Sequence, residues 1–108
     1  MASRVIELTE ATFHTEVLGS PLPVLVDFWA PWCAPCSAAD PVLEQLAGEF
    51  AGKVKVCKLN TSDHPTTGMN YRISSVPTFL LFRGGAVVSQ LVGARLQDLR
   101  GVVERALE

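Results

Sequence analysis

The stretch from Val24 to Pro41 reads VLVDFWAPWCAPCSAADP, and it joins an apolar run to two closely spaced cysteines. Residues 23–29, PVLVDFW, show no alternation of polar and apolar side chains, which is typical of a strand covered on both faces. Past Pro35, apolar side chains recur at helical spacing, and the helix is expected to end near Gly52. They are Ala39, Val42, Leu43, Leu46 and Phe50. The stretch therefore predicts a central strand that leads through a CxxC motif into an amphipathic helix.

Hydrophobic periodicity predicts the elements on either side of this stretch. Thr9 is the expected N-cap of a first helix that carries Phe13 and Val17, and a last helical stripe runs from Leu96 to Ala106. The other expected elements are strands at residues 4–8, 54–59, 77–82 and 86–92 and a short helix or turn at residues 63–71. The order β-α-β-α-β-α-β-β-α, with a hairpin near its end, predicts an α/β fold in which a mixed sheet has helices on both faces.

Length and composition indicate one domain that spans residues 1–108. Hydrophobic residues make up 48% of the chain and charged residues 19%, which is enough apolar material for a core. A net charge of −2 gives no basic surface excess, so we expect neither nucleic acid nor a membrane as a partner. No apolar run is long enough to span a bilayer, and MASRVIELTE lacks the apolar region of a signal peptide. We expect a cytoplasmic protein, or one of an organelle stroma or matrix if a transit peptide has been removed.

Cys33 and Cys36 are placed to close a disulfide across one helical turn. Helical residues three apart have Cα atoms about 5 Å from each other, within the range that a disulfide bridges. Because the pair lies where the strand ends and the helix begins, Cys33 faces free backbone N–H groups and the positive end of the helix dipole. This environment favours a thiolate. Pro35 stiffens the first helical turn, where its missing N–H costs nothing.

A CxxC motif also occurs as half of a zinc site, and that alternative fits this chain poorly. Zinc needs about four ligands, and the remaining candidates are Cys57, His14 and His64, none at a useful spacing. We therefore expect a redox pair and no bound metal. Cys57 lies within a strand, where core filling is the expectation and a regulatory thiol is the alternative. Both histidines are expected at the surface, near helix ends.

Four motifs in this order resemble the thioredoxin family: WCAPC after the strand DFWA, VP before another strand, FRGG at the hairpin and VGA before the last helix. The resemblance covers nearly the whole chain. It implies a central mixed sheet flanked by helices and the activity of a protein-disulfide reductase, with no bound cofactor beyond the redox-active Cys33–Cys36 disulfide. Thioredoxins are themselves a familiar example of a CxxC cysteine with a lowered pKa.

The resemblance implies a role for each cysteine. Cys33 is the nucleophile that attacks a client disulfide, and Cys36 resolves the mixed disulfide that forms. Asp27, an isolated carboxyl on a buried strand, is expected to have a pKa raised by desolvation, which suits a general acid/base that takes the proton of Cys36. The alternative is a carboxylate that is paired structurally. Lys58 matches the family lysine that approaches this aspartate, so both interpretations can hold together.

Client binding is expected at a small surface around the cysteines. Pro77 matches the family's cis-proline, and the backbone at Val76 is implied to bind a client chain as a short strand. Trp32, Gly93 and Ala94 are implied to complete this apolar surface. For Trp32, ordinary packing is the alternative.

Ala34 and Asp40 are unusual for the family's pattern. Ala34 stands where the family usually has glycine, and its greater helix propensity, about 1 kcal/mol, would move the redox potential by only about 20 mV. An effect on client fit beside an exposed sulfur is the alternative. Asp40 follows Cys36 by four residues on nearly the same helix face. It is expected either to be solvated or to lie near Asp27 and Lys58, where it would compete for the lysine and raise the pKa of the aspartate.

The expected electron donor is a thioredoxin reductase, linked either to NADPH through flavin or to ferredoxin, and the expected substrates are client proteins with disulfides. We expect a monomer that serves electron transport and cell redox homeostasis. Two other functions stay open: an oxidase or isomerase of the same fold, and a binding subunit that holds a partner without turnover. The intact Cys33 and Cys36 and the lack of export features favour the reductase.

Overall fold

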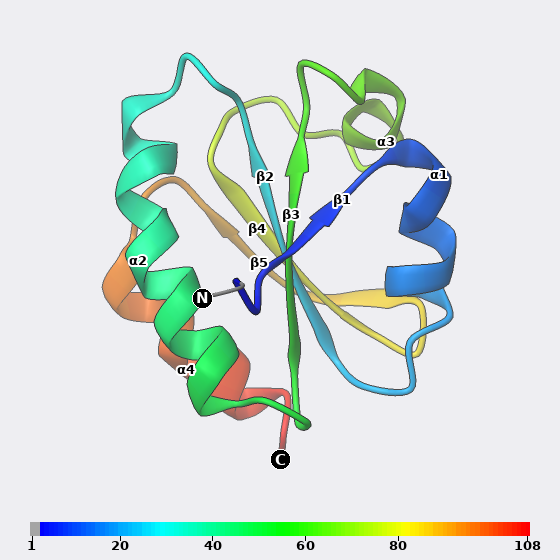
Figure 1. The fold of residues 1–108 in the computed structure, drawn as a ribbon, viewed down its shortest axis with the longest axis vertical. Helices are drawn as coiled ribbons and strands as arrows, with labels where there is room; N and C mark the ends of the chain where they lie inside the picture. The colour runs from blue at the N-terminus through cyan, green and yellow to red at the C-terminus, as the bar shows by residue number, and fades with distance from the viewer. Residues whose placement is uncertain (1–2) are drawn as a thin grey trace.

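The computed structural model describes residues 3–108, which form a five-stranded mixed sheet with helices on both faces (Figure 1). The strands are β1 (Ile6–Leu8), β2 (Val24–Trp29), β3 (Lys55–Asn60), β4 (Thr78–Arg83) and β5 (Ala86–Val92). Their order in the sheet is β1-β3-β2-β4-β5. β1, β3 and β2 run parallel, β4 is antiparallel to β2, and β5 is antiparallel to β4. The predicted α/β fold, with β2 at the centre of its sheet, is confirmed.

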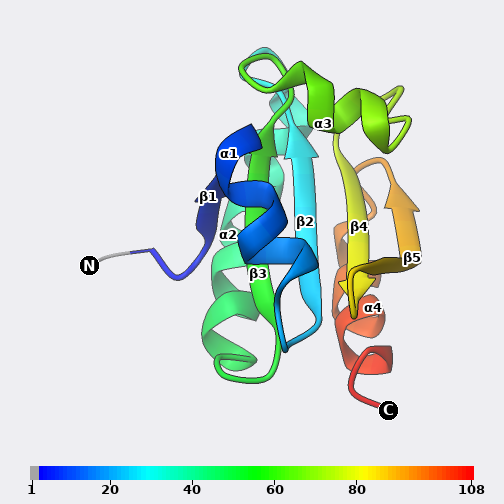
Figure 2. The same cartoon turned by 90° about the vertical axis from the view of Figure 1, so that its right-hand side faces the viewer.

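The helices lie in two layers. They are α1 (Glu10–Phe13) continued by η1 (His14–Leu18), α2 (Ala34–Glu49), α3 (Pro65–Asn70), and η2 (Leu96–Asp98) continued by α4 (Leu99–Arg105). Figures 1 and 2 show α2 and α4 over one face of the sheet and α1 and α3 on the other side. β2 is therefore covered on both faces, which explains its unbroken apolar run. Within residues 3–108, no helix has the length and apolar character needed to cross a membrane.

The first helix differs in part from its prediction. Thr9 caps it as expected, because its hydroxyl accepts the N–H of Thr12 and the Thr12 hydroxyl accepts the N–H of Thr9. Only Glu10–Phe13 is α-helical, and the next turn is a π-helix in which the N–H of Gly19 donates to the carbonyl of His14 at 2.9 Å. The spacing of hydrophobic residues does not reveal a change from α-helical to π-helical hydrogen bonding, so the sequence predicted one continuous helix.

Other boundaries move by a few residues. β4 begins at Thr78 and not at Pro77, because proline has no N–H to donate to a neighbouring strand. α2 ends at Glu49 with Phe50 as its C-cap, and the last helical segment begins with a 3₁₀ turn at Leu96–Asp98. The predicted order of the elements is unchanged.

The two faces of β2 have different contents. Val24, Val26 and Phe28 belong to a buried apolar cluster that includes side chains of α1 and η1. Leu25 belongs to a second buried cluster, formed with side chains of α2 and α4. Because side chains alternate along a strand, Asp27 shares the face of Leu25. The sheet therefore places a carboxyl beneath α2, the helix that begins at the cysteine pair.

Candidate active site

The cysteine pair lies at the junction of β2 and α2. α2 begins at Ala34, and Cys33 is its N-cap in an extended conformation. Cys33 and Cys36 form a disulfide, and their Cα atoms lie 5.3 Å apart. Pro35 occupies the first helical turn, where no N–H is needed. The predicted spacing of the pair across one helical turn is confirmed.

A backbone amide points at the sulfur of Cys33. The N–H of Cys36 donates to Sγ of Cys33 at 3.2 Å, and this bond caps the helix. The free N–H groups of the first turn and the helix dipole stabilise a negative charge at this position. When the pair is reduced, the arrangement therefore favours a thiolate on Cys33 over one on Cys36.

Cys33 is less exposed than the sequence led us to expect. We expected an exposed sulfur beside Ala34, but in the disulfide form Cys33 is only 4% exposed, against 2% for Cys36. Both cysteines pack with Ala30 in a small buried cluster, and Val76 packs against that cluster from the loop before β4. The expectation of an exposed sulfur is therefore wrong for the oxidised pair, because the two bonded residues are packed against neighbouring apolar groups.

Asp27 is fully buried, and neither of its carboxyl oxygens has a hydrogen-bond partner within residues 3–108. Burial raises the pKa of Asp27 to about 7, against the opposing charge of Lys58 and with smaller contributions from the charges of Asp40 and Glu7. The raised pKa thus has the predicted cause, desolvation. The pairing that the alternative supposes is not found among residues 3–108, where neither oxygen has a partner.

Lys58 makes a different contact from the one expected. It lies opposite Asp27 in the β2–β3 register, yet its Nζ bonds to Oδ1 of Asp40 at 2.7 Å. The same ammonium lies over the ring of Trp29, 4.7 Å from the ring centre. The resemblance implied a lysine that approaches the aspartate, whereas Asp40 and Trp29 hold its charged end. Asp40 thus lies near Lys58, although its own side chain stays 46% exposed.

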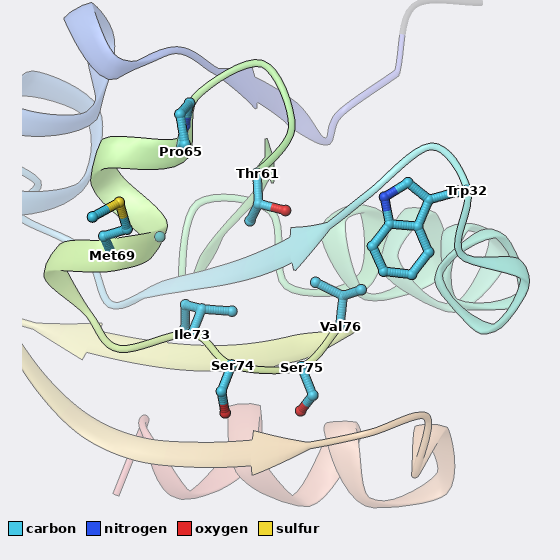
Figure 3. Close-up of a pocket in the computed structure, with 9 residues that line it drawn as sticks. Trp32, Thr61, Pro65, Met69, Ile73, Ser74, Ser75 and Val76 are labelled. Atoms are coloured by element: carbon cyan, nitrogen blue, oxygen red, sulfur yellow. The ribbon is translucent and has the colours of Figure 1, made fainter.

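A groove of about 260 Å³ opens beside the cysteine pair (Figure 3). It is lined by Trp32, Thr61, Pro65, Gly68, Met69, Ile73, Ser74, Ser75 and Val76. Figure 3 shows Trp32 and Val76 close together at one end of this groove and Met69 toward the other end. Trp32 is 76% exposed, so the alternative of ordinary packing is wrong for this side chain.

Sequence reasoning missed most of this groove. Trp32 and Val76 were expected there, but the wall that α3 and the following residues supply was not. On this wall Met69 is 75% exposed, and Ile73 lines the groove beyond it. The available signal was a methionine on a short stretch of small and polar residues, since methionine is common at surfaces that bind varied partners.

The remaining residues of the expected client surface meet at the start of β4. The Val76–Pro77 peptide bond is cis, as the resemblance implies. Pro77 is buried, and its carbonyl accepts the N–H of Gly93 at 2.8 Å. Gly93 has a φ of +90°, which favours glycine, and Ala94 beside it is exposed. The structure therefore brings Gly93 and Ala94 next to Pro77, while Val76 connects them to the groove.

The third cysteine and the two histidines lie in other settings. Cys57 is buried in β3, and burial raises the pKa of its thiol to about 12. His14 is exposed, and His64 is the half-buried N-cap residue of α3. In the part of the chain that the structure describes, no three His, Cys, Asp or Glu side chains are grouped as a metal site requires.

Comparison with known proteins identifies the family. The family model described as Thioredoxin matches residues 4–105. Thioredoxin 1 of Nostoc sp. is 48% identical over 92 residues, which are 85% of this chain and 86% of that protein. A thioredoxin of Synechocystis sp. is 50% identical over 88 residues, 82% of each chain. Thioredoxin M5, chloroplastic, of Oryza sativa subsp. japonica is 46% identical over 94 residues, 87% of this chain and 55% of that protein.

The range matched by the family model includes Asp27, the Cys33–Cys36 pair and Pro77. Thioredoxins are thiol-disulfide oxidoreductases that need no cofactor beyond the redox-active disulfide. The chain therefore belongs to the thioredoxin family, and it is a thiol-disulfide reductase.

Proposed function

We propose that this chain reduces disulfides in client proteins by cycling Cys33 and Cys36 between dithiol and disulfide. The observation that carries the proposal is the position of Cys33, which caps α2 and accepts the N–H of Cys36. The exposed ring of Trp32 immediately precedes it. A stabilised thiolate, a second thiol within bonding distance and a surface for a client are thus available at one place.

The cycle begins with the reduced protein. The thiolate of Cys33 attacks one sulfur of a client disulfide, and the bond between the two client sulfurs breaks. The departing client sulfur leaves as a thiolate and takes a proton from water. Cys33 is then joined to the client by a mixed disulfide. The N-terminus of α2 supports this step because it stabilises the attacking thiolate.

The second step releases the client. Asp27 takes the proton of Cys36, directly or through a water, and the new thiolate attacks the sulfur of Cys33. The mixed disulfide breaks, the client leaves as a thiolate, and the Cys33–Cys36 disulfide forms. The client has gained two electrons and the protein has lost two. A carboxyl whose pKa is raised by burial to about 7 suits this task, because both of its forms are populated near neutral pH.

We propose that an extended segment of the client binds beside the cis-proline, where backbone hydrogen bonds at Val76 hold it as a short strand. Trp32, Gly93 and Ala94 supply apolar contacts around the reactive sulfur. Met69 adds a flexible apolar contact at the far end of the groove, and such a side chain adapts to different clients.

A thioredoxin reductase is the proposed electron donor, and a single-domain monomer is the proposed working form. Reduction of the pair requires a reducing compartment, so we propose the cytoplasm or an organelle stroma or matrix. The rice relative carries the word chloroplastic in its name, whereas the Nostoc relative carries no compartment. The two candidate donors, an NADPH-linked flavin enzyme and a ferredoxin-linked enzyme, are therefore tested side by side.

The first experiment measures reduction of insulin disulfides coupled to each candidate reductase. We expect turnover with at least one of them and none in a Cys33→Ser variant. Cys57→Ser is the matched control, since it also removes one thiol, and the activity of its folded fraction should equal that of the wild type. Turnover that persists in Cys33→Ser would reject the assignment of the nucleophile.

Two variants separate the steps of the cycle. Cys36→Ser should accumulate a mixed disulfide with insulin, because the resolving thiol is missing, and failure to form one would reject the roles given to the two cysteines. Asp27→Asn should form the mixed disulfide normally but resolve it more slowly near neutral pH. A resolution rate equal to that of the wild type at every pH would reject Asp27 as the base.

A further inference from the structure

Two carboxylates, those of Asp27 and Asp40, lie near the charged end of Lys58. Lys58 on β3 lies opposite Asp27 on β2, so both side chains leave the same face of the sheet beneath α2. The ammonium nevertheless bonds to Asp40 of α2 at 2.7 Å and lies over the ring of Trp29. Among residues 3–108, Asp27 has no hydrogen-bond partner for either oxygen. The structure thus shows Lys58 bonded to Asp40 and not to Asp27, the residue opposite it in the sheet.

We infer that Asp40 is a positioning residue that holds the Lys58 ammonium away from Asp27, and that it thereby sets the pH range in which Asp27 serves Cys36. This inference rests on the proposed role of Asp27 as a general acid/base. Asp40 acts through the lysine and its own charge, and no step of bond making or breaking involves it.

Charged side chains from three neighbouring elements act on the carboxyl of Asp27. Lys58 comes from β3, Asp40 from α2, and Glu7 from β1, where it lies opposite Lys58 in the register. A cavity of about 240 Å³ lies at this side of the sheet. It is lined by Ser3, Val5, Glu7, Asp40, Leu43, Glu44 and Lys58. The cation of this group is bonded to Asp40, so it attracts the carboxyl of Asp27 without contacting it.

The position of the Lys58 ammonium decides how strongly Asp27 holds its proton. A cation within about 4 to 6 Å of a carboxyl stabilises the ionised form and lowers its pKa by about 1 to 3. Asp40 withholds this cation from direct contact, and its own negative charge raises the pKa of Asp27 further. The Lys58 side chain is only 14% exposed, so water screens its interactions less than at an open surface. Asp40 therefore favours an Asp27 that exchanges a proton near neutral pH.

The central experiment titrates Asp27 in an Asp40→Asn variant, which keeps the side-chain shape and removes the charge. We expect the NMR titration midpoint of the Asp27 carboxyl carbon in the oxidised protein to fall by about one pH unit, because Lys58 is free to turn toward it. The pH profile of mixed-disulfide resolution should move in the same direction. Asp40→Glu keeps the charge and should return the midpoint toward the wild-type value. An unchanged midpoint in Asp40→Asn overturns the inference.

Two further variants separate positioning from a simple loss of negative charge. Glu44→Gln removes a carboxylate from the wall of the same cavity without removing a partner of Lys58, so the Asp27 midpoint should stay in place. In a Lys58→Gln background, Asp40→Asn should shift the midpoint by less than half as much as it does in the wild type. An equal or larger shift there would mean that Asp40 acts on Asp27 by its charge alone, and it would overturn the inference.

Failure of this inference is distinguishable from failure of the proposed function. If Asp27→Asn slows resolution while Asp40→Asn leaves the Asp27 midpoint unchanged, the base is retained and the positioning role is rejected. If Asp27→Asn leaves resolution unchanged, the role of Asp27 and the influence of Asp40 on resolution are both rejected. Asp40 is half exposed, so its variants are expected to fold, and circular dichroism checks that they do.

Discussion

Phe28 and Asp27 are neighbours on β2, both fully buried, and they face opposite sides of the sheet. Phe28 packs into the apolar cluster on the α1 side, which also holds Phe13 and Phe82, and its ring centre lies 6.4 Å from that of Tyr71. Asp27 lies beneath α2 with no partner for either oxygen among the described residues. Equal burial therefore stabilises the fold at one residue and opposes it at the next, according to the polarity of the buried group.

The apolar side of this comparison is tested by the substitution Phe28→Ala. Because the ring is fully buried among other aromatic rings, we expect the free energy of unfolding to fall by about 5 kcal/mol, the upper end for such truncations. Urea-induced unfolding of the oxidised protein measures the change at several pH values. The loss should be the same at each pH, since no titratable group is removed. A loss below about 1 kcal/mol would contradict the central place given to this cluster.

The polar side of the comparison, Asp27, is tested by measuring stability as a function of pH. The native protein keeps the proton of Asp27 up to about pH 7, whereas the unfolded chain releases it near 3.8. Between these values the native state binds more protons, so the free energy of unfolding falls as the pH rises. The extra proton that the native state binds at Asp27 stabilises it: this stabilisation is fully present below about pH 4 and is lost above about pH 7. Its size is about 4 kcal/mol, from a pKa difference of about three at about 1.4 kcal/mol each.

Asp27→Asn isolates this contribution. The amide does not titrate in this range, so the unfolding free energy of the variant should lack the decline that the wild type shows between about pH 4 and 7. The measurement is a set of urea unfolding curves of the oxidised proteins across that range. Glu44→Gln, an exposed charge change on α2, is the control and should keep the decline. Parallel pH curves for the wild type and Asp27→Asn would mean that Asp27 ionises normally in the fold.

Trp32 extends the comparison to an apolar side chain that is not buried. Since its ring is 76% exposed, Trp32→Ala should change the free energy of unfolding by no more than about 0.5 kcal/mol. The kcat/KM for insulin reduction should fall by about tenfold, a loss of about 1.4 kcal/mol in client contact. Met69→Ala, at the other end of the groove, should cost less. A large loss of stability with unchanged kcat/KM would place Trp32 with Phe28 as a core residue.

The sequence predicted what depends on local pattern. The uninterrupted run of β2, the CxxC at a helix start and the apolar stripe of α2 each lie within one segment, and each was found in the structure. The raised pKa of Asp27 also followed from a polar residue within an apolar strand. Hydrophobic spacing did not reveal the π-helical turn at His14–Leu18, because a change in hydrogen-bond partner leaves the pattern of apolar residues intact.

The parts that could not be predicted depend on contacts between distant segments. Whether Lys58 binds Asp27 or Asp40 is decided by how α2 packs on the sheet, which no single segment encodes. The same holds for the groove, whose two ends are lined by Met69 of α3 and by Trp32 only after folding. The burial of Cys33 likewise depends on Val76 from the other side of the site.

The smallest expected effect concerns Ala34, which is exposed at the first turn of α2. Ala34→Gly removes a helix propensity of about 1 kcal/mol. If all of it distinguished the oxidised from the reduced pair, the redox potential would change by about 20 mV, so we expect a change no larger than this. Equilibration with glutathione mixtures measures the potential, and the ratio of kcat/KM for two clients measures fit. A change in redox potential well above about 20 mV would be larger than the difference in helix propensity between alanine and glycine can explain. Ala34 would then have to act on the stability of the Cys33 thiolate itself, which would place it among the groups that tune the pair.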